Sequence, residues 1–495
     1  MATAAVELET IRPATATMAL YGLLGFAAGL PFYMFSTVLA LRLTEHGVGL
    51  VVIGFFAWVT LLPTFKFLWA PLCDRIDVPG FSAFFGRRRG WIMMSALGIF
   101  TSLLAMAATA DDKSLAVTAL FAVLLAFWTT TLEVAADAWR IELAPTQAMQ
   151  GPIVAANLWG YRSAMVAAGS GALIVADRAG WHWAYTLIAI VAFLPFPLLA
   201  AMSREDGRSG TRFTALTGGV GASAAILGGV ALVVAAIGWV VLWLAQAAGI
   251  GAASNVTPWV LGICMLPFVL MALALPRIKR AGPDDPLRHS PALGPYVDVF
   301  WRFGYPALVV LAFVSIYRMG DVLALTLSKP LVKGLGYTLT QIGVADGVVA
   351  LAASMTGVAI GGFLAVKWPL WRALIVGALF AAIGNFGFVW LAHQPVGETV
   401  LYIATAADQF GNGMAGAVFV VYLSMLVNPR HPAAQYAFLS GFAFLLARLL
   451  AGASGSMTTA IGYDAFFILA GGLSLGALVL LPFVANVRPR ADDMA

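Results

Sequence analysis

Four basic side chains lie inside long apolar segments, where charges are unusual: Lys66, Arg162, Arg318 and Arg448. A charge near the centre of a bilayer costs roughly 2.5–3.5 kcal/mol on insertion scales, so such a group normally faces a protein interior or a water-filled cavity and has a partner. The three arginines lie nine or more residues from both ends of their segments, which is too deep to reach a membrane surface easily. We interpret the arginines as cavity-lining, with buried structural ion pairs as the alternative, whereas Lys66 is close enough to a segment end to extend outward.

Acidic residues that can pair with such cations recur at helical spacing. In the stretch TTTLEVAADAWRIEL, Glu133, Asp137 and Arg140 fall within about 60° of one another on a helix with about 100° per residue. Asp321 follows Arg318 by three residues, a spacing that also brings two side chains together on a helix. The simpler interpretation of Asp137 and Arg140 is an ion pair near the membrane surface.

The elements that must position these residues are membrane-spanning helices. Of 495 residues, 61% are hydrophobic and only 10% are charged, which excludes an ordinary soluble domain. A helical span needs roughly 20 apolar residues, and the apolar runs are continuous rather than alternating with period 2 as in a barrel. The sequence therefore predicts an all-α polytopic membrane protein with fourteen spans. These are expected near 19–41, 50–72, 91–109, 115–138, 152–176, 183–202, 215–245, 256–275, 305–327, 341–364, 372–391, 399–427, 433–459 and 464–486.

The distribution of Lys and Arg between the short loops predicts the orientation. If both termini are cytoplasmic, that side holds nineteen of the 28 basic residues and the opposite side holds five. The positive net charge is thus a topological signal, and it requires no nucleic-acid partner. The first eighteen residues lack a basic region and an obvious cleavage site, so the first span is expected to remain in the mature protein.

Cysteine and histidine usage argues against a metal site. The two cysteines, Cys73 and Cys264, are too few and too embedded in apolar sequence for a disulfide framework, and the five histidines lie in or beside loops without ligand spacing. The sequence also shows no arrangement of a nucleophile with a base. We therefore expect no metal, no cofactor and no catalytic residues, so the chain is not expected to be an enzyme.

An internal repeat divides the spans into two halves. The stretches 41–62 and 329–351 share an apolar helix, a short Gly-containing loop and a second helix that begins with Ile-Gly, and 160–174 corresponds to 445–457. Two six-helix bundles in parallel repeat are typical of a major-facilitator transporter, whose substrate site lies between the halves near the membrane midplane. We therefore expect ionic groups of both bundles to line one water-filled chamber.

Four regions follow from this division. We expect an N-terminal six-helix bundle at 1–203, a linker with two inserted transmembrane helices at 204–275, a cytoplasmic linker with an amphipathic segment at 276–304, and a C-terminal six-helix bundle at 305–495. The inserted pair preserves the sidedness of the second bundle because it adds an even number of spans. The amphipathic stretch runs from Tyr296 to Phe303 and is expected to lie along the membrane surface.

Several motifs together resemble those of the AmpG-type muropeptide permeases. They are KFLWAPLCDR with FFGRRRGW, GFAAGLPFYM, DAWRIEL, GYRSAM, YRMGD and AQYAFLS. The first pair looks like an expanded version of the acidic and basic signature between helices 2 and 3 of major-facilitator proteins, and the set spans essentially all twelve core helices. The chain differs from familiar members in the central position of its extra helices, and in Leu132 and Glu133, where a Gln-Asp pair is expected.

The resemblance implies a proton-coupled transporter in the bacterial inner membrane. Members of that family import N-acetylglucosaminyl-anhydro-muramic acid, with or without its stem peptide, from periplasm to cytoplasm for peptidoglycan recycling. The implied partners are this small amphiphilic solute, protons and membrane lipid, and the chain is expected to be a monomer. Alternatives are a major-facilitator transporter of another anionic or sugar-like solute, such as an acyl-coenzyme A or a drug, and a membrane receptor that binds without transporting.

The residue types fit the chemistry of such a solute. A guanidinium stays charged when buried and offers a paired donor fork to a carboxylate, while tyrosine and amide side chains suit sugar hydroxyl and acetamido groups. An acid that gains and loses an arginine partner can bind and release a proton. The proton-coupling candidates are, in order, Glu133, Asp137 and Asp321. The substrate-binding candidates are Arg162, Arg318, Arg448, Tyr33, Tyr161, Tyr317, Asn412, Gln435 and Tyr436.

The basic loop between the second and third spans has a separate predicted role. Its charged residues are Asp74, Arg75, Arg87, Arg88 and Arg89. We expect them at the cytoplasmic surface, where they would latch the outward-open state by pairing with helix ends. The equally simple alternative is that they hold the topology and bind anionic lipid.

Overall fold

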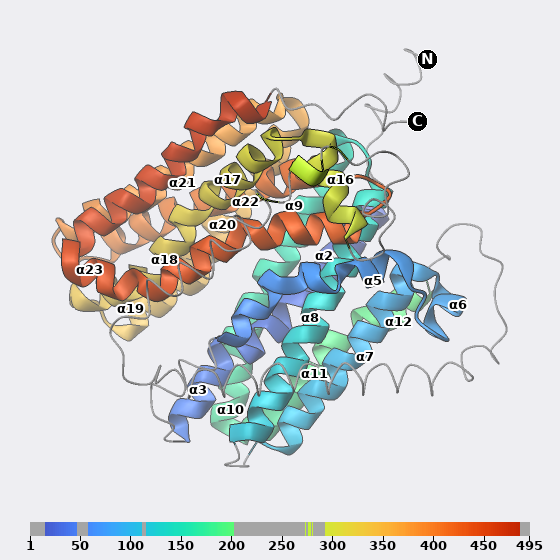
Figure 1. Cartoon of the computed structure of the whole chain (residues 1–495). Coiled ribbons are helices and arrows are strands. Elements are labelled where there is room, and N and C mark those ends of the chain that lie inside the picture. Colours follow the sequence, from blue (N-terminus) through green and yellow to red (C-terminus); the bar gives the residue numbers. More distant parts are fainter. Residues whose placement is uncertain are drawn as a thin grey trace. The chain divides into compact units, whose positions relative to one another are not determined.

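The computed structural model describes residues 15–46, 58–110, 115–201 and 293–485, with isolated positions between 273 and 280. Every regular element in these ranges is a helix, as Figure 1 shows, which confirms the expected all-α class. The two inserted spans predicted at 204–275 lie almost wholly outside the described residues, and so does Cys264.

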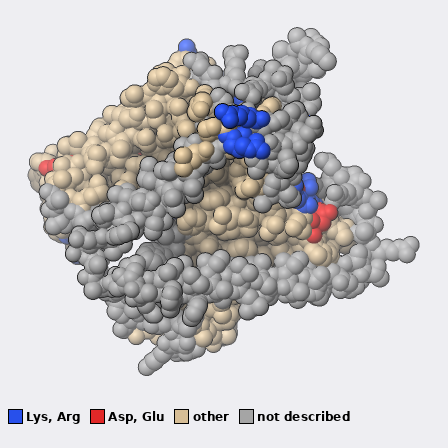
Figure 2. Space-filling view, viewed as in Figure 1, with Lys and Arg blue, Asp and Glu red and all other residues tan. Residues whose placement is uncertain are grey.

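Eight described helices are long and apolar enough to cross a membrane. They are Thr15–Phe35, Arg87–Ala108, Val117–Leu143, Pro306–Gly334, Gln341–Lys367, Leu370–Ala392, Glu398–Leu426 and Ile461–Val484. Among the described atoms in Figure 2, few belong to charged residues on the face shown. The chain is therefore a multi-pass membrane protein, and the expected total of fourteen spans stays a prediction.

The chain divides by its internal contacts into two compact units. The N-terminal unit comprises Thr15–Leu143 and the chain from Trp159, and the C-terminal unit includes Ala144–Leu158 and the described chain from 293 onward. The division falls inside one helix, α9 (Gln147–Val166). The first half of this helix therefore groups with the C-terminal unit, although the sequence-based boundaries at 203 and 305 keep it with the N-terminal bundle.

Small residues let the helices of the N-terminal unit approach closely. A Cβ on Gly160 of α9 would collide with the carbonyl oxygen of Gly22, and a Cβ on Gly98 would collide with the Trp128 ring. Close contacts of this kind replace the hydrophobic drive that is missing between helices in lipid. The other elements of this unit are α2 (Thr15–Phe35), α3 (Thr37–Glu45), η1 (Trp58–Leu68), α5 (Ala70–Arg75), α6 (Phe81–Phe85), α7 (Arg87–Ala108), α8 (Leu115–Leu143), η2 (Ala167–Ala172), α10 (Leu173–Ala179), α11 (Trp181–Phe193) and α12 (Pro195–Ala201).

The C-terminal unit contains the yellow to red helices of Figure 1. Its last helix bends sharply at Gly462, whose φ of 81° favours glycine, so the two predicted spans at 433–459 and 464–486 meet at this residue. The elements are α16 (Gly294–Phe303), α17 (Pro306–Tyr317), α18 (Met319–Gly334), α19 (Leu339–Val344), η3 (Ala345–Val349), α20 (Ala350–Lys367), α21 (Leu370–Ala392), α22 (Glu398–Leu426) and α23 (Pro432–Ala485).

The first half of α9 packs on the C-terminal end of α20. Gln147 Nε2 donates to the Trp368 carbonyl oxygen at 3.1 Å. One turn further, a Cβ on Gly151 would lie 2.8 Å from the Gly362 carbonyl oxygen, so the two backbones meet at a pair of glycines. Val154 continues the contact in an apolar cluster with residues of α20 and α22.

Glycines also set the distance between α20 and α22, and this yields a first prediction. A Cβ on Gly357 would collide with the Phe410 carbonyl oxygen, whereas a Cβ on Gly343 meets nothing within 4 Å. Gly357→Leu should lower the free energy of unfolding by about 1–3 kcal/mol, because overpacking forces the helices apart. Thermal unfolding of the purified protein in detergent measures the change. Gly343→Leu is the matched control, and an equal loss in both variants would contradict the packing described here.

Candidate functional site

Arg318 occupies the break between two helices of one span. α17 ends at Tyr317 and α18 begins at Met319, and Arg318 between them has φ −103° and ψ −1°. Gly320 lets α18 approach α23, because a Cβ at this position would collide with the backbone of Ala470. In the sequence YRMGD, the cation Arg318 therefore lies at the break, and the anion Asp321 lies in the first turn of α18.

The Arg318 guanidinium is held by α18 and α22 together. Its Nη2 donates to Asn412 Oδ1 at 2.8 Å, and its Nη1 donates to the Asn412 carbonyl oxygen at 3.1 Å. The same Nη1 lies 2.8 Å from Asp321 Oδ2. Only 8% of Arg318 and 4% of Asp321 is exposed, so this ion pair lies in the interior of the C-terminal unit. The predicted i,i+3 pair is present.

Uncharged groups complete the surroundings of the pair. Asn385 of α21 is fully buried beside the Asp321 carboxyl group, and Gly416, one turn from Asn412, leaves room against the guanidinium. The sequence analysis missed Asn385, although a single amide in the middle of an apolar span was a usable signal. The Tyr317 hydroxyl donates to the Leu374 carbonyl oxygen at 2.9 Å.

The charges of Arg318 and Asp321 determine what the site could bind. A buried ion pair is compensated only while both partners keep their charge, and removing one leaves the other uncompensated at a high cost. Protonation of Asp321 would remove its charge, whereas Arg318 cannot be deprotonated in a protein. Arg318 would then favour a second carboxylate as its partner. Protonation of Asp321 would therefore favour binding of a carboxylate to Arg318.

A second charged cluster lies in the N-terminal unit. Arg140 Nη2 donates to Asp137 Oδ1 at 3.0 Å, and Lys66 Nζ from η1 lies 3.9 Å from Asp137 Oδ2. Next to it, Trp69 Nε1 donates to Thr131 Oγ1 at 3.1 Å. Lys66 and Arg140 are buried and Asp137 is partly exposed. Asp137 of α8 therefore pairs with two cations, and Lys66 is a partner that helical spacing did not predict.

The other predicted residues of the N-terminal unit are half-buried. Glu133 lies on α8, one turn before the cluster, and Arg162 lies on α9 directly after Tyr161. The rings of Tyr33 and Tyr161 contact the Phe32 ring, with centroid distances of 6.0 Å and 6.2 Å. Two helices thus bring these tyrosines to one aromatic group beside Arg162.

Two further candidates lie on α23 in the C-terminal unit. Arg448 is half-buried, and its guanidinium carbon lies 5.5 Å from the centroid of the Phe444 ring. Tyr436 is buried, with 5% of its surface exposed. Of the predicted substrate residues in this unit, Asn412 bonds to Arg318, and Tyr317 precedes Arg318 in the chain.

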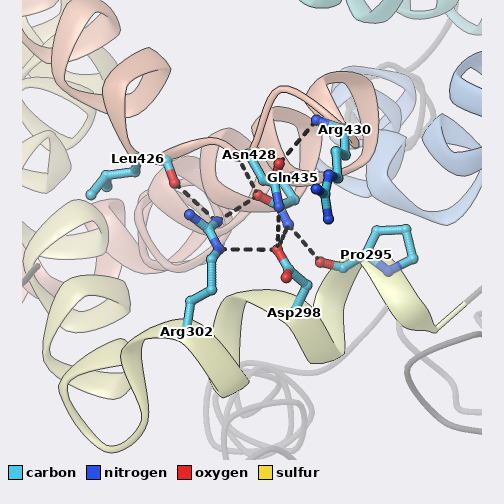
Figure 3. A network of polar contacts seen from close by, with 7 residues as sticks. All are labelled: Pro295, Asp298, Arg302, Leu426, Asn428, Arg430 and Gln435. Carbon is cyan, nitrogen blue, oxygen red and sulfur yellow. Dashed lines mark hydrogen bonds and ion pairs between the residues drawn. The ribbon is translucent and has the colours of Figure 1, made fainter. Parts of the chain in front are cut away.

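Gln435 belongs to a different network, which Figure 3 shows. Its Oε1 accepts from Arg302 Nη2 at 2.8 Å, and its Nε2 donates to Asp298 Oδ2 at 2.6 Å and to the Pro295 carbonyl oxygen at 2.9 Å. The network joins the amphipathic helix α16 to the loop before α23 through Asn428, whose backbone N–H donates to the same Oε1 at 2.8 Å. The amide of Gln435 is thus engaged at both ends, and we leave this residue out of the proposed substrate site.

The basic loop is fixed within the N-terminal unit by a buried arginine. Arg88 Nη2 lies 2.9 Å from Asp74 Oδ1 and 2.6 Å from Glu142 Oε1, and Nη1 donates to the Cys73 carbonyl oxygen at 2.8 Å. Burial, together with the Asp74 carboxylate, raises the pKa of the Cys73 thiol, which therefore stays protonated at neutral pH.

The remaining basic residues of the loop differ in exposure. Arg89 is buried and donates to the Leu199 carbonyl oxygen. Arg87 is half-buried and Arg75 is exposed. Asp74, Arg88 and Arg89 therefore hold their own unit together, and the latch between states stays a prediction.

Comparisons with known proteins agree with this architecture. No family model matches the chain. In solved structures, the fold is similar to the proton:xylose symporter XylE of the major facilitator superfamily, bound to 6-bromo-6-deoxy-D-glucose, with a TM-score of 0.58, 15% identity and coverage of 96% of this chain and 95% of that one. It is also similar to the human organic anion transporter MFSD10, with a TM-score of 0.51, 16% identity and coverage of 94% and 97%. The chain thus has a major-facilitator fold.

Curated relatives point to a narrower group. The chain is 26% identical to the anhydromuropeptide permease of Escherichia coli K12 over 464 residues, which cover 93% of this chain and 78% of that protein. It is 25% identical to the putative transporter AmpG 4 of Rickettsia conorii over 463 residues, with coverage of 93% and 95%. These relatives confirm the resemblance seen in the motifs, and their names as permease and transporter confirm that the chain is a transporter rather than an enzyme.

The buried arginine of the basic loop gives a second prediction. Arg88→Gln should lower the free energy of unfolding by about 3–5 kcal/mol, because it leaves buried Asp74 without its cation. Thermal unfolding in detergent measures the loss. Arg75→Gln, which changes an exposed arginine of the same loop, should change stability by less than about 0.5 kcal/mol. Similar stability of the two variants would show that the Arg88 contacts do not hold the loop.

Proposed function

We propose that this protein is a proton-coupled importer of anhydro-muropeptides in the inner membrane of a bacterium. It would carry the anhydro-disaccharide, with or without its stem peptide, from periplasm to cytoplasm for peptidoglycan recycling. Two findings support the proposal: the similarity to a protein named anhydromuropeptide permease over 93% of the chain, and the buried Arg318–Asp321 pair. We further propose that both termini are cytoplasmic and that the protein acts as a monomer.

The Arg318–Asp321 pair is the observation that carries the mechanism. In the resting state the Asp321 carboxylate and Asn412 satisfy the guanidinium. A proton from the periplasmic side neutralises Asp321, and the carboxylate of the substrate takes its place on Arg318. When the site opens to the cytoplasm, the substrate leaves with its carboxylate, and Asp321 releases its proton and pairs with Arg318 again. Each step keeps the buried site close to neutral, which avoids an uncompensated charge.

The charged cluster of the N-terminal unit has a supporting role in this proposal. Asp137 pairs with both Lys66 and Arg140, so a substrate carboxylate can bind one of these cations without protonation of Asp137. Glu133, one turn away on the same face of α8, remains the candidate there for a second titrating group. Arg162 and the pair Tyr33 and Tyr161 are proposed to contact the sugar rings of the substrate.

A third prediction tests Arg318 as a ligand. Proteoliposomes that contain the wild-type protein should accumulate labelled anhydro-disaccharide when the outside is acidic. Arg318→Gln should reduce uptake by at least about tenfold, because hydrogen bonds to charged groups contribute roughly 1.5–3 kcal/mol. Arg372→Gln is the matched control, since this exposed arginine of the same unit lies over the Trp371 ring and should keep the wild-type rate. Uptake by Arg318→Gln at the wild-type rate would exclude the carboxylate role.

A fourth prediction tests Asp321 as the proton carrier. Asp321→Asn should abolish accumulation driven by a pH gradient and should retain exchange of labelled for unlabelled substrate across the membrane, because exchange needs no net proton movement. Glu133→Gln and Asp137→Asn, measured in the same way, show whether an acid of α8 carries the proton instead. Gradient-driven accumulation by Asp321→Asn would remove this residue from the role.

A further inference from the structure

A second polar cluster lies in the C-terminal unit, apart from the Arg318 site. Lys329 Nζ on α18 lies 2.9 Å from Asp346 Oδ2 on η3. On α22, Gln409 Nε2 donates to Asp408 Oδ2 at 2.8 Å. These four side chains line one small pocket of about 30 Å³, together with the hydroxyl groups of Ser328 and Thr405. The proposed function leaves this pocket without a role.

The size and the polar groups of the pocket indicate what it would hold. A volume of about 30 Å³ exceeds the roughly 10–15 Å³ that one water needs, so it suits the end of a polar group rather than a whole ligand. Asp346 and Asp408 offer carboxylate oxygens to an ammonium group, and Lys329 offers a cation to a carboxylate. The positive charge of Lys329 disfavours a metal ion at the same place. The pocket is therefore complementary to a group that bears both an ammonium and a carboxylate.

A local departure from the α-helix positions Asp346. The segment Ala345–Val349 is a π-helix between α19 and α20, and such segments occur frequently at functional sites because they change the direction of side chains. The start of α19 is fixed by a capping box between Thr338 and Gln341. Asp346 thus lies in a helical segment that continues directly from the capped helix α19.

The ion pair contributes little to the fold. The side chains of Lys329 and Asp346 are 62% and 40% exposed, and pairs that are this accessible stabilise proteins weakly. Their charges can therefore be removed or exchanged without unfolding the protein. A change in transport by such variants would then report a change in ligand binding rather than a loss of folded protein.

The pocket and the Arg318 site lie along the same two helices. Asp408 is one turn from Asn412 on α22, and Lys329 is eleven residues beyond Arg318 on α18, which corresponds to roughly 16 Å at 1.5 Å per residue. An extended ligand of disaccharide-peptide size spans such a distance. The separation of the two places thus matches the length of one extended substrate molecule.

We propose that Lys329, Asp346 and Asp408 form a subsite for a zwitterionic amino-acid group in the peptide part of the substrate. The inference rests on the proposed function and extends it, because it assigns the peptide-bearing form of the substrate its own recognition site. The ammonium of the ligand pairs with Asp346 and Asp408, and its carboxylate pairs with Lys329, which exchanges its partner on the protein for one on the ligand.

The test compares three labelled probes in proteoliposomes. They are the anhydro-disaccharide without peptide, the same sugar with a tripeptide whose last side chain carries free ammonium and carboxylate groups, and that tripeptide form with its ammonium acetylated. Lys329→Gln and Asp346→Asn should raise the KM for the zwitterionic probe about tenfold and change uptake of the peptide-free sugar less than twofold. The acetylated probe should be taken up by wild type with a similarly raised KM.

Matched controls separate recognition from structure. Lys333→Gln changes an exposed lysine one turn further along α18, and Asp464→Asn changes an exposed acid that pairs with His393; neither should alter the KM of any probe. The double variant Lys329→Asp with Asp346→Lys keeps an ion pair but reverses it. If the ion pair had only a structural role, this exchange would restore the wild-type KM. If the subsite binds the ligand, the KM for the zwitterionic probe should stay raised.

The outcomes distinguish the two proposals. If wild type takes up the peptide-free sugar, and the zwitterionic probe has the same KM in wild type and in the single variants, the subsite is overturned and the proposed function stands. Restoration of the wild-type KM by the reversed pair overturns the subsite as well. If wild type takes up none of the three probes, both proposals fail together. A raised KM for the zwitterionic probe alone, not restored by reversal, supports the subsite.

Discussion

The structure depends on how a buried arginine keeps its charge compensated inside a membrane protein. Arg318 lies almost fully enclosed, and its partners are one carboxylate and one amide residue from two different helices. Leaving such a charge unpaired in the interior would cost several kcal/mol. The helix break at residue 318 places the guanidinium beside these partners, and Gly320 allows α18 to approach α23 closely.

The same constraint appears in the N-terminal unit with different residues. Arg88 is compensated by Asp74 and Glu142, and Asp137 by Lys66 and Arg140. These clusters differ in what they can do. The Arg88 cluster uses its anions to fix a loop. Arg318 and Asp321 are one cation and one anion, so we propose that a substrate carboxylate binds Arg318 only when Asp321 is protonated. Asp137 pairs with two cations, so a carboxylate can bind there without a proton, and we therefore assign the coupled proton to the C-terminal unit.

Helical spacing predicted the pairs that lie within one helix and missed those that join two. Arg318 with Asp321 and Arg140 with Asp137 are three residues apart, and both pairs are present. The bonds from Arg318 to Asn412, and from Gln435 to α16, depend on which helix faces which, and no sequence period contains that information. Continuous apolar runs predicted the eight spans found among the described residues, but they contain no signal for the π-helix at Asp346 or for the break at Arg318.

The central claim is that the carboxylate of the substrate replaces Asp321 on Arg318, so that binding of substrate requires a proton. Proton uptake on adding the anhydro-disaccharide to the purified protein in weakly buffered detergent solution, followed with a pH indicator, measures this directly. The account predicts about one proton taken up per substrate bound by wild type and close to none by Asp321→Asn. Substrate binding without proton uptake in wild type, or equal uptake in both proteins, would contradict it.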